Sequence, residues 1–188
     1  MFDCWTNCRG GRFVFLVGTL VVSIFVVGAD DETILFNAVS SGNFEEVKDL
    51  ILTKKININA ENEFGETPLH LSAISNSDSK GQILRFLLQN SAEVNKQTGY
   101  QYEGHNIIVK RSPLHWYVYA CDVVGVRELL KYGADPLLLT EEKESSIDVV
   151  KKIIEAANRS GDPQGKNCLR VLNMMEEALN DANRAGTL

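Results

Sequence analysis

Two tetrapeptides decide the fold: Thr67-Pro68-Leu69-His70 and Ser112-Pro113-Leu114-His115. Thr67 and Ser112 are each placed to cap a helix with the side-chain hydroxyl, and the proline that follows occupies the first helical position, where a missing N–H costs nothing. Each copy is followed, in the same order, by a Leu-Leu pair and by an alanine next to an acidic residue, at 87–93 and 129–135. The pattern predicts a repeated helix-turn-helix unit.

These motifs resemble the ankyrin repeat, a unit of about 33 residues that stacks into a solenoid. The resemblance implies an all-α architecture and a binding module. It also implies structural roles for His70 and His115, because the histidine of this motif ties neighbouring turns together by hydrogen bonds in the family. Gly65, just before the first copy, permits a turn conformation that a Cβ would penalise.

Weaker copies extend the register on both sides. Thr33-Ile34-Leu35-Phe36 takes the place of the tetrapeptide upstream, and Ser145-Ser146-Ile147-Asp148 begins 33 residues after Ser112. We therefore expect a repeat domain over 30–157 with four helix pairs, the first and last atypical. The expected units are 31–60, 61–96, 97–136 and 137–157.

A further helix is expected near the C-terminus, after a turn-rich link that begins at 158. Leu169, Leu172, Met175 and Leu179 share one face of this helix at helical spacing. Within 158–188 it is expected to cover the open end of the solenoid, and a partner-binding role is the alternative. Asn158-Arg159-Ser160 also fits the N-glycosylation sequon.

The first 29 residues belong to another class of sequence. Arg9 and Arg12 precede an apolar run over 13–28, and Val27-Gly28-Ala29 supplies small residues at its exit. This arrangement is typical of a secretory signal peptide. The run is shorter than the roughly 20 residues of a comfortable transmembrane helix, and an uncleaved signal anchor is the alternative. Either outcome predicts export of the repeat domain: secreted, lumenal or periplasmic after cleavage, or membrane-anchored on the non-cytoplasmic side.

Four cysteines accompany this segment and the repeats. Cys4 and Cys8 lie in the leader and would be lost on cleavage. Cys121 and Cys168 are expected to be two separate buried thiols, which are common in protein cores. Pairing of the two in an oxidising compartment is the alternative.

One turn is about nine residues longer than the repeat pattern requires. The insert runs from Gln97 to Lys110 and has strand-forming residues on both sides of Glu103-Gly104-His105-Asn106, which predicts an extended β-hairpin-like finger. Such a finger is either a partner-contacting element or a tolerated loop insertion, since surface loops lengthen at little cost. His105 is expected in its turn.

The first helix of the third unit carries Trp116-Tyr117-Val118-Tyr119 where the family favours small residues. Trp116 and Tyr117 are expected to fill core volume, and Tyr117 requires the neighbouring unit to make room. Tyr119 is expected to face the concave groove, with Ile74 at the matching place one repeat earlier. The candidate partner-binding residues are aromatic, apolar or exposed turn positions: Phe64, Ile74, Tyr100, Tyr102, His105 and Tyr119.

Composition and motifs argue against several classes of function. The net charge of −6, without a basic stripe, disfavours nucleic acid and anionic lipid as partners. No phosphate-binding glycine loop, HExxH motif or paired CxxC spacing occurs, so no catalytic, cofactor or metal site and no small-molecule substrate are predicted. The expected function is a non-enzymatic, exported adaptor or scaffold that binds a protein partner not identified by the sequence. The alternative is a membrane-anchored domain with a structural or assembly role.

Overall fold

The computed structural model describes residues 15–17, 20–22, 31–102, 105–107 and 110–185, with side chains over 31–99 and 110–185. Eight helices lie within these ranges: α1 (Asp31–Ser41), α2 (Phe44–Leu52), α3 (Pro68–Leu71), α4 (Lys80–Gln89), α5 (Pro113–Tyr119), α6 (Val123–Lys131), α7 (Ser146–Ser160) and α8 (Gly165–Ala185). Two short antiparallel strand pairs accompany them: β1 (Phe15–Val17) with β2 (Leu20–Val22), and β3 (Tyr100–Tyr102) with β4 (His105–Ile107).

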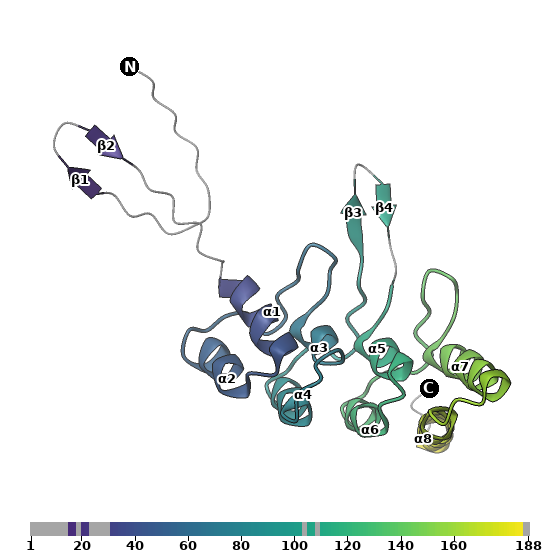
Figure 1. Cartoon of the computed structure of the whole chain (residues 1–188). Helices are drawn as coiled ribbons and strands as arrows, with labels where there is room; N and C mark the ends of the chain where they lie inside the picture. The colour runs from purple at the N-terminus through teal and green to yellow at the C-terminus, as the bar shows by residue number, and fades with distance from the viewer. Residues whose placement is uncertain (1–14, 18–19, 23–30, 103–104, 108–109, 186–188) are drawn as a thin grey trace.

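The helices form four consecutive pairs that stack side by side. Each pair is internally packed, and odd-numbered helices contact the next odd-numbered helix while even-numbered helices contact the next even-numbered one. Figure 1 shows the two resulting rows, with the finger of β3 and β4 projecting from the side of α3 and α5. The predicted all-α solenoid is confirmed, although its fourth helix pair is completed only beyond residue 157, by α8.

The two tetrapeptides cap their helices as their sequence predicts. The backbone N–H of Thr67 donates to Nδ1 of His70 at 3.1 Å, and that of Ser112 donates to Nδ1 of His115 at 3.2 Å. The proline of each motif begins its helix. In the fourth pair Asp148 replaces the histidine and accepts from the backbone N–H of Ser145 at 2.9 Å. Reciprocal capping of this kind fixes where each helix starts.

Histidine also joins adjacent units. With Nδ1 of His70 accepting a hydrogen bond, its proton lies on Nε2, which donates to the backbone carbonyl of Arg111 at 3.0 Å. Nε2 of His115 has no partner of ordinary geometry among the described residues. The expected link between turns is therefore made by His70.

One continuous apolar core runs between the two rows of helices. Its fully buried members come from every pair and include Leu35, Val47, Leu69, Leu87, Leu114, Val126, Leu129, Val150, Val171 and Met175. Burial of a leucine side chain stabilises the fold by about 1.5–3 kcal/mol relative to its exposure. The stack is held mainly by these contacts, because most of its helices, α1 to α6, are too short to be stable alone.

The predicted hairpin finger is present. Tyr100 pairs with Ile107 and Tyr102 pairs with His105 in an antiparallel register. His105 is therefore the first residue of a strand and not the turn residue that the sequence suggests. At the base of the finger, Gly65 has a φ of +70°, and an added Cβ there would collide with the backbone of Gly99.

The C-terminal helix differs from its expected place. The sequence predicts that the fourth unit ends at 157 and that a separate covering helix follows a link. Instead α7 continues to Ser160, and α8 begins at Gly165 and packs along α7 and α6. It is the second helix of the last pair. Gly161 ends α7 in the left-handed conformation with a φ of +73°, which leaves only a tight turn between the helices.

Cys121 and Cys168 form a disulfide, so the expectation of two separate thiols is wrong. Cys121 ends the turn between α5 and α6, and Cys168 lies in the first turn of α8. Because α8 completes the fourth pair and lies against α6, it brings two cysteines together that are 47 residues apart in sequence. The bond joins the third and fourth pairs.

The apolar leader lies mostly outside the described residues, including the predicted exit at Val27-Gly28-Ala29. The described parts are the strands β1 and β2, paired from Phe15 with Val22 to Val17 with Leu20. Among the described residues, no helix has the length and apolar character that crossing a membrane requires.

Candidate functional site

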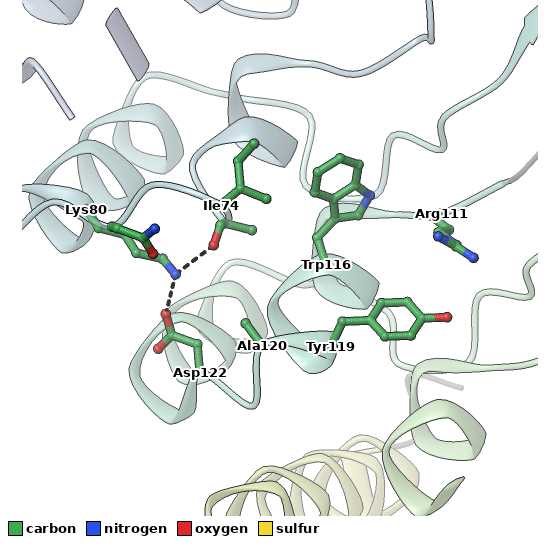
Figure 2. A pocket seen from close by; sticks show the side chains of 9 residues that line it. Ile74, Lys80, Arg111, Trp116, Tyr119, Ala120 and Asp122 are labelled. Atoms are coloured by element: carbon green, nitrogen blue, oxygen red, sulfur yellow. Dashed lines mark hydrogen bonds and ion pairs between the residues drawn. The ribbon is translucent and has the colours of Figure 1, made fainter. Parts of the chain in front are cut away.

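A groove of about 680 Å³ lies between the ends of α3 and α5, on the row of helices nearer the finger. Ile74, in the turn after α3, and Tyr119, the last residue of α5, both line it (Figure 2). Ile74 is 54% exposed and Tyr119 is 45% exposed. The structure thus brings two of the candidate partner-binding residues to one open surface.

Tyr117 lies beneath this surface and is fully buried. Its hydroxyl is 2.8 Å from Oγ of Ser72 in the preceding unit, and its burial raises the pKa of the phenol. The expectation that Tyr117 fills core volume is confirmed. A buried tyrosine hydroxyl with a partner avoids the penalty of an unmet polar group, so the ring adds rigid apolar bulk below the groove.

Lys80 and Asp122 close one end of the groove. Nζ of Lys80 lies 2.9 Å from Oδ2 of Asp122 and donates to the carbonyl of Ala73 at 2.7 Å, and Figure 2 shows both interactions. Oδ1 of Asp122 accepts from the backbone N–H of Gly125 and so caps α6. The charges of Lys80 and Asp122 therefore neutralise each other within the wall.

Arg111 stands at the other end, where the finger joins the repeat. Its backbone is held on both sides: the N–H donates to Oγ1 of buried Thr98 at 3.1 Å, and the carbonyl accepts from Thr98 and from His70, each at 3.0 Å. Its guanidinium carbon lies 5.1 Å from the ring centroid of Tyr119. The hydrogen bonds hold the backbone of Arg111 in place, and the contact with Tyr119 sets its guanidinium at the groove.

Trp116 has its expected role only in part. It is half-buried and packs against the core, as predicted, but it also lines the groove between Ile74 and Arg111 (Figure 2). One edge of the indole packs against the ring of His70, with centroids 5.9 Å apart. Its Nε1–H is shielded from solvent and has no acceptor among the described residues.

The other candidates lie on the finger or beside its base. Phe64 is 43% exposed, and its carbonyl accepts from the backbone N–H of Gly99 at 3.2 Å, which joins the first turn to the base of the long finger. Tyr100 and Tyr102 lie in β3 and His105 in β4, and their side chains fall outside the described residues. The structure places them on the finger next to the groove.

The sequence analysis did not place several lining residues in the groove, among them the charged or aromatic residues Lys80, Arg111, Trp116 and Asp122. Arg111 lies between the insert and the second tetrapeptide, and a single basic residue there carries no signal of its own. Lys80 begins α4, and the repeat pattern does not determine the course of the segment that connects α3 to α4. A signal existed only for Trp116, as a bulky residue at a position that favours small ones.

Burial shapes the electrostatics of the motif histidines. It lowers the pKa of His70 to about 4, an effect only partly offset by the hydrogen bonds to the backbones of Arg111 and Lys96. Burial also lowers the pKa of His115, although the nearby backbone of Glu144 acts in the opposite direction. Both imidazoles are therefore neutral at pH 7. His70 hydrogen-bonds in its cap and to the next turn, whereas His115 hydrogen-bonds to Ser112 in its own cap. Within the described ranges, no group of three or more His, Cys, Asp or Glu is arranged to hold a metal ion.

Comparison with known proteins agrees with the stacked helix pairs and with the repeated histidine-containing motif. The family model for ankyrin repeats in three copies matches residues 14–98 and 35–140, which together span more than half of the chain. The chain belongs to the ankyrin-repeat family. The matched region contains α1 to α6, the finger and all the groove residues, so the groove is a surface of the ankyrin stack.

The ankyrin region also resembles part of a known enzyme. Over 61 residues the chain is 43% identical to the palmitoyltransferase akr1 of Schizosaccharomyces pombe. The match covers 32% of this chain and only 9% of that relative. The similarity therefore concerns one segment of sequence and less than a tenth of that enzyme's length.

Proposed function

We propose that this chain is a non-enzymatic interaction module that binds a protein partner through the groove between α3 and α5 and through the adjacent finger. Ankyrin repeats in general suggest a protein-interaction module. The single observation that carries the proposal is that the exposed side chains of Ile74 and Tyr119 line the same groove. Exposed apolar and aromatic side chains that share a concave surface are typical of binding sites.

The rigidity of the site supports the same proposal. The floor is fixed by the hydrogen bond between Tyr117 and Ser72, and the walls are fixed by the Lys80–Asp122 pair and by the anchored backbone of Arg111. A surface that is already ordered loses little conformational entropy on binding. Rigid aromatic anchors then contribute most of the interface energy.

A capture experiment with matched variants tests the proposal. The full chain is used to capture protein partners from its native compartment, beside an Ile74→Ala/Tyr119→Ala variant. The control is Val124→Ala/Leu169→Ala, which removes side chains that are 51% and 49% exposed but do not line the groove. We expect the groove variant to lose capture and the control to retain it. Equal capture by both would overturn the proposed site.

We propose further that the ankyrin domain works in an exported compartment. The leader-like sequence at 1–29 motivates this localisation, and the disulfide between Cys121 and Cys168 supports it, because disulfides persist in oxidising compartments and are rare in the cytosol. Fractionation combined with the mass of the mature chain is the test. A shortened product outside the cytosol agrees with cleavage, and a full-length membrane product agrees with an anchor. A full-length, freely soluble cytosolic product contradicts both.

A further inference from the structure

Two hydrogen-bond donors at the finger end of the groove have no acceptor. The Nε–H of Arg111 and the Nε1–H of Trp116 are both shielded from solvent and unpaired among the described residues. Both groups can only donate. The indole nitrogen lies on the side of the Trp116 ring nearer Arg111 (Figure 2). The groove therefore offers an excess of donors, which fits a ligand that brings an acceptor.

The guanidinium of Arg111 lies beside Tyr119. Its carbon is 5.1 Å from the ring centroid of Tyr119, within the range of a cation–π contact. The edge of a guanidinium carries its planar fork of N–H donors, which matches the two oxygens of a carboxylate.

The charges around the groove leave Arg111 without a carboxylate partner among the described residues. It forms no ion pair with any described carboxylate, whereas Lys80 is paired with Asp122. Of the acidic residues on the next turn, Glu141 pairs with Lys110 and Glu144 pairs with Lys152. Glu142 is near enough to Arg111 for their charges to interact, but the two side chains form no ion pair. On a chain with a net charge of −6, this is a local site for an anion.

We propose that Arg111 and Trp116 form a subsite for a carboxylate of the bound partner, an aspartate or glutamate side chain in an otherwise apolar peptide segment. The N–H groups of the Arg111 guanidinium donate to the carboxylate. A small rotation of the Arg111 side chain lets the indole N–H of Trp116 donate to the same carboxylate. Ile74 and Tyr119 contact the apolar residues beside it. The inference rests on the proposed function and names the chemistry of the partner at one point of the site.

Peptide selection tests the subsite and does not require the partner protein itself. A phage-displayed library of random peptides is selected against the full chain and against Arg111→Gln, Trp116→Phe and Arg85→Gln. Arg85 is an exposed arginine on α4, away from the groove, so its change removes the same charge elsewhere. Circular dichroism confirms that every variant is folded before selection.

We expect peptides selected on the wild type and on Arg85→Gln to share an acidic residue at one fixed position. Arg111→Gln should weaken the binding of these peptides by about tenfold or more, and Trp116→Phe by several fold, since hydrogen bonds to charged groups are strong ones. Replacing the acidic residue of the peptide by its amide should cause the same loss as Arg111→Gln, and the two losses should not add.

The possible failures are distinguishable. Peptides that bind the groove without an acidic position, or that bind Arg111→Gln equally well, overturn the carboxylate subsite and leave the proposed function standing. A library from which no peptide is enriched on the wild-type chain overturns the proposed function and the subsite with it.

Discussion

The ring of Tyr117 lies directly against the backbone of Gly125, so that a Cβ added at residue 125 would overlap the ring carbons Cδ1 and Cε1. Tyr117 belongs to α5 and Gly125 to the helix that it pairs with, α6. Tyr117 stands where this repeat usually has a small residue. Two small residues make room for its ring: Gly125 in its own unit and Ser72 in the preceding unit.

This relationship predicts that, in a double-mutant cycle, the effect of Gly125→Ala on the free energy of unfolding changes sign when Tyr117 is replaced by alanine. Gly125→Ala in the wild-type chain should destabilise the fold by about 1–3 kcal/mol, because overpacking outweighs the gain of about 1 kcal/mol in helix propensity. In a Tyr117→Ala background the same change should stabilise the fold by about 0.5–1 kcal/mol, since the clash is gone. Denaturant unfolding measures all four free energies.

Gly81 provides the control for this cycle. It lies in α4, and a Cβ added there would meet no atom within 4 Å. Gly81→Ala should therefore be neutral or slightly stabilising in both backgrounds. A Gly125→Ala effect that is the same with and without the Tyr117 ring would show that the two residues do not share the space described.

The disulfide should contribute measurably to stability. It closes a segment of 47 residues between the third and fourth pairs, a loop length for which chain entropy predicts roughly 4 kcal/mol. Reduction should lower the free energy of unfolding by about 2–4 kcal/mol and should loosen α8 first. Unfolding curves with and without reductant, with a Cys121→Ala/Cys168→Ala variant as the insensitive control, measure the effect. Free thiols at both positions in the native chain would contradict the bond.

Acidification should destabilise the fold through His70. Its pKa is 6.5 as a free side chain and about 4 in the folded protein. As the pH falls through this window, the unfolded chain binds a proton that the folded imidazole does not, so the free energy of unfolding decreases. This loss of stability is complete below about pH 4 and amounts to roughly 3 kcal/mol at most.

Nuclear magnetic resonance of the imidazole protons measures this titration directly. The pKa of Asp148 is lowered by its hydrogen bonds to Ser145, so the stability linked to Asp148 is lost only below its ordinary value of 3.8, outside the window of His70. A resonance of His70 that titrates near pH 6.5 in the folded chain would show that the imidazole is not buried as described.

The finger should contribute to binding and little to stability. Tyr100→Ala/Tyr102→Ala removes two aromatic residues from β3, which projects from the stack (Figure 1). The melting temperature should stay nearly constant, and partner capture should weaken because aromatic anchors tend to dominate interface energy. Thermal unfolding and a binding assay on the same preparation separate the two effects. An intact fold with unchanged affinity would make the finger only a long loop.

Much of the fold was predictable because its signals are local. The reciprocal caps at Thr67 and Ser112, the prolines after them and the apolar spacing of the second helices depend on a few neighbouring residues. The hairpin also follows from local pattern. These features set the helix starts and the order of the pairs before any tertiary contact is known.

What could not be predicted depends on contacts between units. Cys121 meets Cys168 only because α8 returns along α6, and the sequence alone allowed α8 to be a separate cover. Trp116 both packs against the core and lines the groove, a combination that depends on the neighbouring unit. The course of the loop that delivers Lys80 to Asp122 is likewise set by tertiary contacts.

Hydrogen–deuterium exchange on the complex is the most direct test of binding at the groove and finger. The full chain is compared with and without a partner or a selected peptide bound at saturation. We predict slower exchange in the turn after α3, at the base of the finger around Arg111 and along α5, with α2, α4 and α6 unchanged. Protection confined to the helices of the opposite row, or to α8, would contradict the assignment of binding to the groove and finger.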